Sequence, residues 1–239
     1  MGTDRTRAGA TGGAPSVSVI VPFRDKGSPE RRANFEYVHA RLVADGWSVT
    51  VASDGQDGPF NRSAAYNAGR AQAPADVYVW FEADMLIPRA QLERGIELAA
   101  ESPGLVVPFT EYRYYTYGDS VAIIDGAPPE AIRPDFVMGK GRSIGAVGIT
   151  SEATMQTVGR WDEKFAGWGH DDNAMFRAFQ VCAGQPRWVD GPGHHLWHPP
   201  GMQDPRPEEQ DASNANFSRW LRYKNAEDPA EIRELTNEL

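Results

Sequence analysis

The sequence has little cysteine, no long apolar run and no excess of positive charge. Cys182 is its single cysteine, which excludes an internal disulfide and favours a reducing compartment. No apolar run reaches the roughly 18 residues that cross a bilayer, and residues 1–15 lack the apolar core of a signal peptide. Lys and Arg number 24 against 33 Asp and Glu, which argues against binding nucleic acid through overall charge. We therefore expect a cytoplasmic protein without a membrane span or a nucleic-acid partner.

The composition is that of a globular protein. Apolar residues make up 41% and charged residues 24% of the 239 positions, so one sizeable core with a small appendage is expected. Residues 1–15 have no periodicity and are predicted to be a disordered leader. The main domain is predicted over residues 16–200. Residues 201–239 are predicted to form a mobile loop and C-terminal helices.

Buried strands alternate with amphipathic helices along the first half of the chain. Near-continuous apolar runs predict strands over residues 17–23, 47–53, 76–84 and 105–109. Apolar stripes and helix-start residues predict helices over residues 29–43, 61–71 and 89–101. This alternation predicts an α/β protein with a doubly wound sheet and a C-terminal helical appendage.

The second half of the chain is less regular. Residues 110–142 are predicted to be irregular surface with some strand, because Tyr, Gly and Pro dominate there. Small residues over 143–150 predict a strand that a ligand approaches closely, with Gly145 as a substrate contact. Residues 171–182 are predicted to form a helix. Residues 199–210 are predicted to be a mobile loop and 211–238 one or two surface helices.

Polar side chains follow three of the predicted strands. Ligands of such sheets bind beyond the carboxyl ends of the strands, where Arg24, Asp54, Glu82 and Asp84 lie. Glu82 and Asp84 are two residues apart, so both carboxylates reach one point if the chain turns there. Carboxylate oxygens suit Mg²⁺ or Mn²⁺ bound together with a diphosphate. A loop that is merely acidic is the alternative.

Three of the five histidines gather in "HHLWHPP" as His194, His195 and His198. The i, i+3 pair of His195 and His198 offers imidazole nitrogens to a metal that also takes carboxylate oxygen. A surface histidine cluster is the alternative. The sequence leaves open whether His194 or His195 joins His198 at a metal.

The stretch "FAGWGHDDNAMF" places two acids at the start of a predicted helix. Carboxylates there bind free N–H groups and favour the helix dipole, but one acid is enough for a cap. Asp171 and Asp172 therefore suggest that one acid caps or binds substrate while the other acts as a base toward a hydroxyl. Trp168 offers a flat apolar face to a sugar ring, or packs in a buried turn.

Arginines and tyrosines supply further candidates. Arg62 stands in the first turn of a predicted helix, where a guanidinium binds phosphate or a uracil carbonyl, or else is a solvated charge. Arg24 is interpreted in the same way. A group of four tyrosines forms an aromatic acceptor platform or lines a surface loop: Tyr112, Tyr114, Tyr115 and Tyr117.

Four motifs in series resemble the β-1,4-galactosyltransferases of glycosyltransferase family 7. They are "VIVPFRD", "FNRSAAYNAG", "VWFEADMLIP" and "FAGWGHDDNAMF", which with the histidines fall within residues 19–198. The sequence is less similar to chondroitin-polymerase-type and polypeptide N-acetylgalactosaminyltransferases. The resemblance implies a GT-A fold, with a Rossmann-like nucleotide-sugar-binding mixed sheet, a UDP-sugar donor and a divalent metal, Mn²⁺ or Mg²⁺.

The resemblance also implies roles for individual residues. Those matching its nucleotide-binding motifs are Pro22, Phe23, Arg24, Phe60 and Arg62, and we add Asp54 from its place at a strand end. Glu82 matches the position that binds donor ribose or sugar, and the metal ligands match Asp84, His195 and His198. The acceptor-side positions match Trp168, Gly169, His170 and Asp171. Asp172 falls in the place of the catalytic base.

Three departures from the family distinguish this chain. Glu82 is one methylene longer than the family's Asp, and Asp171 is one methylene shorter than its Glu. His170 replaces a Gly beside the acceptor, so the acceptor need not be N-acetylglucosamine. The family's membrane anchor and disulfides are missing, which indicates a bacterial or phage cytoplasmic relative.

The sequence therefore predicts a metal-dependent inverting glycosyltransferase that moves a sugar from a UDP-sugar to an acceptor hydroxyl. The acceptor is a glycan, a protein or a small molecule, and residues 199–210 are predicted to close as a lid over the donor. Two alternatives remain open: a retaining enzyme like the polypeptide N-acetylgalactosaminyltransferases, and a non-catalytic nucleotide- or sugar-binding module. A metal-dependent phosphoesterase is a third, which leaves Trp168 and the Phe-Asn-Arg motif unexplained.

Overall fold

The computed structural model describes residues 13–141, 144–201 and 206–238. Most of the predicted leader (1–15) lies outside these residues. So do residues 202–205 of the predicted mobile loop and lid, and residue 143 of a predicted strand.

The central sheet is mixed. In the described part of the chain it contains, in spatial order, β2 (Val49–Ala52), β1 (Val17–Pro22), β3 (Val77–Phe81), β8 (Val147–Ser151), β5 (Val106–Val107) and β9 (Arg187–Trp188). β1 pairs in parallel with β2 and β3, whereas β8 runs antiparallel to both β3 and β5. The predicted α/β class is confirmed. Because β1, β2 and β3 are parallel, their carboxyl ends meet at one edge of the sheet.

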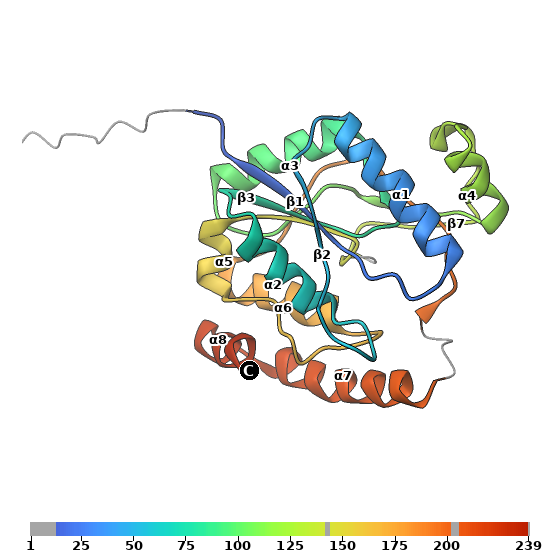
Figure 1. The fold of residues 1–239 in the computed structure, drawn as a ribbon. Helices are drawn as coiled ribbons and strands as arrows, with labels where there is room; N and C mark the ends of the chain where they lie inside the picture. The colour runs from blue at the N-terminus through green and yellow to red at the C-terminus, as the bar shows by residue number, and fades with distance from the viewer. Residues whose placement is uncertain (1–12, 142–143, 202–205, 239) are drawn as a thin grey trace, which may run out of the picture.

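Helices cover both faces of this sheet, as Figure 1 shows. One face carries α1 (Pro29–Ala44) and α3 (Arg89–Glu101), and the other carries α2 (Arg62–Gln72), α5 (Glu152–Val158) and α6 (Asp171–Ala183). The predicted helices at 29–43, 61–71 and 89–101 agree with α1, α2 and α3 within one residue at each end. The spacing of apolar residues along these segments was sufficient to predict the helices, and tertiary contacts did not change them.

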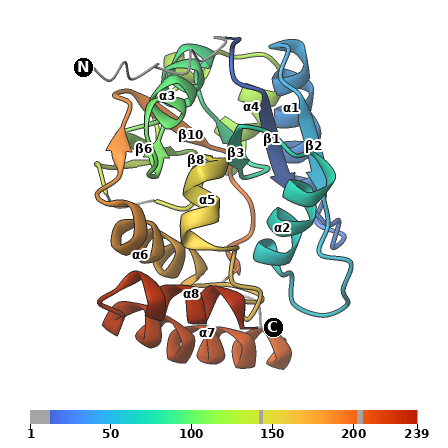
Figure 2. The same ribbon diagram turned by 90° about the vertical axis from the view of Figure 1, so that its left-hand side faces the viewer.

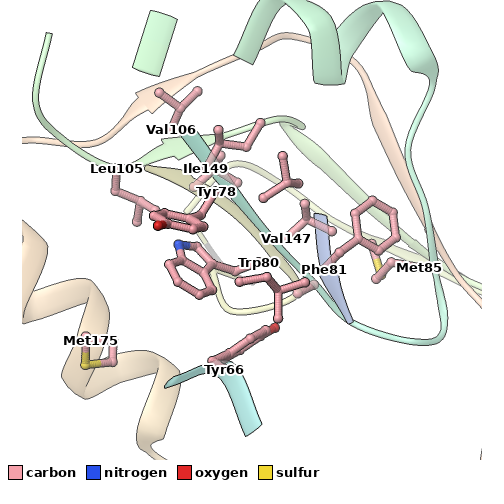
Figure 3. Packing of buried hydrophobic residues seen from close by; sticks show 14 of the residues in the cluster. Tyr66, Tyr78, Trp80, Phe81, Met85, Leu105, Val106, Val147, Ile149 and Met175 are labelled. Atoms are coloured by element: carbon pink, nitrogen blue, oxygen red, sulfur yellow. The ribbon is translucent and has the colours of Figure 1, made fainter. Parts of the chain in front are cut away.

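Two glycines allow helices to lie close to the sheet. A Cβ on Gly69 of α2 would lie 2.4 Å from Ile20 Cγ2, and one on Gly95 of α3 would lie 2.5 Å from Ile149 Cδ1. β3 is buried along its whole length, and its Trp80 donates through Nε1 to Thr150 Oγ1 at 2.9 Å. Figure 3 shows Trp80 at the centre of this packing. The core therefore fixes β3 and α2 relative to each other.

A second sheet extends the edge at which the parallel strands end. Its strands are β4 (Met85–Leu86), β10 (Pro192–His195), β6 (Glu111–Tyr114) and β7 (Phe136–Met138), in that spatial order. Residues 110–142 also contain α4 (Tyr117–Ile124) and the short 3-10 helix η1 (Pro129–Ala131). The strands predicted within 110–142 are confirmed by β6 and β7, whereas α4 and η1 were not predicted.

Other predicted boundaries moved for similar reasons. The predicted strand over 76–84 ends at Phe81, and the chain turns before β4 begins. The predicted strand over 143–150 is β8, which runs to Ser151. α5, β9 and β10 were not predicted, since two of them are short and the third is a strand of Pro, Gly and His residues stabilised by its neighbours.

The C-terminal segment contains α7 (Pro207–Asn225) and α8 (Pro229–Asn237), which Figure 2 shows beneath α6 and α5. The last four residues of the predicted mobile loop, 207–210, are helical. Tyr223, Ile232 and Leu235 are buried, so the predicted surface helices also contribute to the core. Among the residues that the structure describes, no helix combines the length and apolar composition needed to cross a membrane.

Asp162 ties α7 to the main domain. Its carboxylate is fully buried and accepts hydrogen bonds from Arg219 Nε at 2.7 Å and Tyr223 Oη at 2.8 Å. Both donors lie on α7. A buried carboxylate is tolerated only with such partners, so Asp162 holds the appendage in a defined position.

Replacing Asp162 by alanine should lower the free energy of unfolding by about 3 kcal/mol, because the Arg219 charge is only 10% exposed and loses this carboxylate. Urea denaturation measures the loss. The control is Glu97→Ala, which removes a partner of exposed Arg94 and should cost less than about 1 kcal/mol. Equal losses in the two variants would contradict this account.

Candidate metal and carboxylate site

The two acids in the turn after β3, Glu82 and Asp84, contact different partners. Glu82 directly follows Phe81, the last residue of β3, and Asp84 directly precedes Met85, the first residue of β4. Glu82 forms an ion pair with Arg62, whereas Asp84 is buried and faces two histidines. One edge of the sheet thus carries both a carboxylate–imidazole group and a carboxylate–guanidinium group.

Asp84, His195 and His198 bring three ligand atoms within 4.8 Å of one another. Asp84 Oδ2 lies 3.0 Å from His198 Nε2, and Asp84 Oδ1 lies 3.9 Å from His195 Nε2. The register of the second sheet explains this meeting, because His195 of β10 pairs with Met85 of β4. The next residue, Leu196, donates its N–H to the Asp84 carbonyl at 2.9 Å. The triad joins segments that are distant in sequence.

The protonation states of this triad suit a cation. Burial lowers the pKa of His195 to about 4, so its imidazole is neutral at pH 7. Burial opposes the charge of Asp84, but His195 and His198 hold its pKa below the ordinary value. His198 Nδ1 lies 3.0 Å from the Pro199 carbonyl and its Nε2 lies 3.0 Å from Asp84 Oδ2, so contacts on both sides orient the ring.

Buried polar atoms without a hydrogen-bond partner also indicate that the triad can hold a cation. Asp84 Oδ1 and His195 Nδ1 are buried, and neither has a hydrogen-bond partner within the described ranges. A buried carboxylate oxygen without a hydrogen-bond partner is stabilised by a positive charge. One carboxylate and two imidazoles are a donor set that Mn²⁺ accepts.

His194 lies on the opposite face of β10. Its Nδ1 is 2.7 Å from Tyr115 Oη, whose hydroxyl is also 3.0 Å from the Pro129 carbonyl. Adjacent side chains of a strand alternate between its faces, so His194 and His195 cannot both reach Asp84. Of the two, the geometry favours His195 as the partner of His198.

Arg62 joins three carboxylates. It is the first residue of α2, whose N-cap Asn61 accepts a hydrogen bond from Ala64 N at 2.9 Å. Its Nη1 pairs with Glu82, its Nε and Nη2 lie 2.8 and 2.6 Å from Asp171 Oδ2, and its Nη2 lies 3.3 Å from Asp172 Oδ1. The guanidinium therefore links the end of β3 to the start of α6.

The two acids at the start of α6 have different electrostatics. Burial opposes the charge of Asp171, but Arg62 lowers its pKa below the ordinary value. Burial and the Asp171 charge raise the pKa of Asp172 to about 6, against the opposing effect of Arg62. The Asp172 side chain is 36% exposed. Asp172 is thus the acid that exchanges a proton near neutral pH.

Gly145 lies directly against Asp172. A Cβ on Gly145 would be 2.4 Å from both Cβ and Oδ2 of Asp172. The close approach predicted for a ligand at Gly145 is therefore made by the Asp172 side chain. Because Gly145 has no side chain, the loop before β8 can lie directly against the Asp172 carboxylate of α6.

Arg24, Asp54 and Phe60 lie together beyond β1 and β2. Arg24 Nη1 is 3.1 Å from Asp54 Oδ1, and the guanidinium lies 5.4 Å from the centroid of the Phe60 ring. Asp54 Oδ2 also accepts from Asn61 N at 2.9 Å. These contacts connect the carboxyl ends of two strands to the start of α2.

Pro22 and Phe23 lie at the end of β1, Pro22 as its last residue and Phe23 directly after it. Phe23 stacks on Phe35 of α1 with ring centroids 4.0 Å apart, and Pro22 is buried as the last residue of β1. The residues matching the nucleotide-binding motifs therefore occupy one region of the sheet edge. Their contacts to a nucleotide remain predictions.

The loop before α6 presents an exposed aromatic ring. Trp168 is 48% exposed, and Gly169 has a φ of 105°. His170, the N-cap of α6, has a φ of 67° and is the one non-glycine residue with positive φ in the described part of the chain. Its left-handed backbone suits the Gly that the resembled family has here. The His170 ring lies 5.4 Å from that of Phe217 on α7.

The four tyrosines of 112–117 do not share one surface. Tyr112 and Tyr115 are buried, and Tyr117 is exposed on α4. Tyr114 is half-buried, with its ring 4.9 Å from that of His195. The charges of Asp84 and Asp172 contribute, after burial, to raising the Tyr114 pKa. Tyr114 and the buried Tyr112, whose ring centroid is 5.5 Å from that of His195, are thus the members of the group that lie at the candidate site.

Sequence reasoning missed Tyr66 and Phe217. Tyr66 follows Arg62 by one helical turn, and that spacing was a usable signal. Phe217 reaches His170 across 47 positions of sequence, and no local pattern predicts that contact.

No model of a known protein family matches the sequence, and no curated protein matches it. Solved structures resemble the fold. Drosophila beta1,4-galactosyltransferase 7 is 16% identical with a TM-score of 0.48, covering 82% of this chain and 78% of its own. Glucosyl-3-phosphoglycerate synthase from Mycobacterium tuberculosis is 13% identical with a TM-score of 0.49, covering 87% and 80%.

The structure of GalNAc-T7 is also similar to this chain. It is 11% identical with a TM-score of 0.52, and the match covers 93% of this chain. The chain matches 54% of the GalNAc-T7 structure, about half its length. At this identity the similarity concerns the fold, and the predicted fold is confirmed: this chain has the GT-A fold.

Proposed function

We propose that this chain is a metal-dependent inverting glycosyltransferase with a UDP-sugar donor. The observation that carries the proposal is the meeting, at one sheet edge, of Asp84, His195 and His198 with an acid pair whose exposed member, Asp172, has a pKa of about 6. The solved structure of GalNAc-T7, which shares the fold, contains UDP, GalNAc and Mn²⁺. A cation site beside a base is the combination that sugar transfer from a diphosphate needs.

The donor side comprises the end of β1, the start of α2 and the turn after β3. Arg24 and Arg62 supply positive charge for the diphosphate, and the Phe60 ring beside Arg24 offers an apolar face to the nucleotide. Glu82 accepts from donor hydroxyls. Asp84, His195 and His198 would hold the Mn²⁺, which when bound would offset the negative charge on the departing UDP.

The acceptor side comprises the loop before α6 and the start of that helix. Trp168 stacks on the acceptor, and Gly169 lets it approach the backbone. Asp171 accepts a hydrogen bond from the acceptor, and Asp172 takes the proton of the attacking hydroxyl. The acceptor oxygen bonds to the anomeric carbon as the bond to the UDP oxygen breaks on the opposite face. His170 and Phe217 add a surface that selects the acceptor.

A retaining reaction is the second candidate, because the fold is shared with GalNAc-T7. Inversion is favoured by the position of Asp172, which is partly exposed and titrates near neutral pH. A binding module without catalysis leaves this second acid without a task.

Time-resolved NMR of donor hydrolysis distinguishes the two reactions. UDP-sugars with an α-linked sugar should release the β-anomer first, because the attacking oxygen enters from the face opposite UDP. First release of the α-anomer would establish retention and remove Asp172 as the base.

His198→Ala should weaken Mn²⁺ binding by about 100-fold or more, because it removes one of three ligand groups. Isothermal titration with Mn²⁺ measures the affinity. The control, His39→Ala on α1, alters a histidine outside the triad and should leave the affinity unchanged. Equal affinities for the His198 variant and the native protein would contradict the metal assignment.

Asp172→Asn should reduce turnover by about 10²–10⁴-fold, because the amide cannot accept the proton. Its melting temperature should be unchanged or higher, since the substitution removes charge repulsion with Asp171. Asp211→Asn, at an exposed site on α7, is the matched control and should remain active.

The pH dependence tests the same assignment. A base must be ionised, and the pKa of Asp172 is raised to about 6, so kcat/KM should fall as the pH drops through about 6 and level off above it. A profile that is flat between pH 5 and 7 would argue against Asp172 as the base.

A further inference from the structure

Tyr66 carries a buried hydroxyl that lacks a partner. The residue is fully buried, and no described residue accepts a hydrogen bond from its Oη. Its ring is fixed by Trp80 and Trp161, with centroids 5.3 and 4.7 Å away, and Figure 3 shows it beneath Trp80. Burying an unpaired hydroxyl destabilises a protein, and phenylalanine would fill the same volume without that cost. We therefore expect the Tyr66 hydroxyl to form a hydrogen bond in a second conformation of the site.

The surroundings of this hydroxyl contain the acids of the site. Tyr66 follows Arg62 by four residues in α2, so both side chains lie on one face of the helix. Burial raises the pKa of Tyr66, Arg62 opposes the rise, and the negative charges of Asp171, Asp84 and Asp172 add to it. The phenol thus lies within the electrostatic reach of Asp171 and Asp172, two of the carboxylates that Arg62 contacts.

Arg62 has competing tasks. In this structure its guanidinium is committed to Glu82, Asp171 and Asp172. Binding a diphosphate would draw it away from some of these partners, and Asp171 would lose two contacts to the same oxygen, at 2.6 and 2.8 Å. A carboxylate as buried as Asp171 then needs another donor. Tyr66 supplies an O–H on the same helix face.

We propose that Tyr66 is a positioning residue whose hydroxyl takes over a hydrogen bond to Asp171 when Arg62 turns toward the donor diphosphate. The exchange of hydrogen-bond partners involves only residues of this chain. Its trigger, the binding of the donor diphosphate, rests on the proposed function. The exchange keeps Asp171 ionised and oriented toward the acceptor while Asp172 remains free to take a proton. Donor binding then prepares the acceptor side of the site.

A double-mutant cycle on thermal unfolding tests the exchange without any substrate. Tyr66→Phe in the native background should raise the melting temperature by about 2–4 °C, because it removes an unpaired buried hydroxyl. In an Arg62→Met background, the Tyr66 hydroxyl should already donate a hydrogen bond to Asp171. There the same substitution should lower the melting temperature by a similar amount. A shift of the same sign in both backgrounds would overturn the proposal. If Arg62→Met does not fold, Arg62→Ala, which also removes the cation, replaces it with the same expected reversal.

A second arm uses UDP with Mn²⁺ as the probe. At saturating UDP and Mn²⁺, the gain in melting temperature from Tyr66→Phe should disappear or reverse, and turnover should fall about tenfold with an unchanged donor KM. An undiminished gain at saturation, with full turnover, would also overturn the proposal. If UDP and Mn²⁺ do not bind at all, the proposed function fails while the substrate-free cycle still decides the role of Tyr66.

Discussion

The contact of one guanidinium with three carboxylates is the constraint on which the site depends. Arg62 joins Glu82, after β3, to Asp171 and Asp172, at the start of α6. Without it these acids would repel one another in partly buried surroundings. Even with it, the pKa of Asp172 is raised to about 6. One positive charge thus connects the proposed donor and acceptor sides and sets the protonation of both acids.

Backbone geometry supplies the rest of the arrangement. Parallel pairing of β1, β2 and β3 brings their polar end residues to one edge, and the pairing of β10 with β4 brings His195 to Asp84. Gly145 leaves space for Asp172, and the left-handed His170 begins the helix that carries it. Arg62, Asp172 and His195 are therefore positioned by α2, α6 and β10, which pack against the core, and this suits a site whose geometry is preorganised.

The sequence predicted what depends on local pattern. Apolar periodicity located α1, α2, α3 and the parallel strands, and acids after β3 were correctly placed at a sheet edge. It missed β10, which depends on pairing with β4 and β6, although the i, i+3 spacing had already indicated His195 and His198 as partners of Asp84. α4 was missed although Thr116 and Asp119 form a capping box, a signal that the sequence does contain. The partners of Arg62 could not be predicted, because they come from two segments, the turn after β3 and the start of α6, that are distant from Arg62 in sequence.

The central claim is that a divalent cation and a uridine diphosphate bind this edge together. Isothermal titration of UDP into the protein, with and without Mn²⁺, tests it most directly, because a shared site makes each ligand increase the affinity for the other. The account predicts measurable UDP binding that requires Mn²⁺ and is lost in Asp84→Asn. Binding of UDP that is equally strong without Mn²⁺, or no binding under either condition, would contradict it.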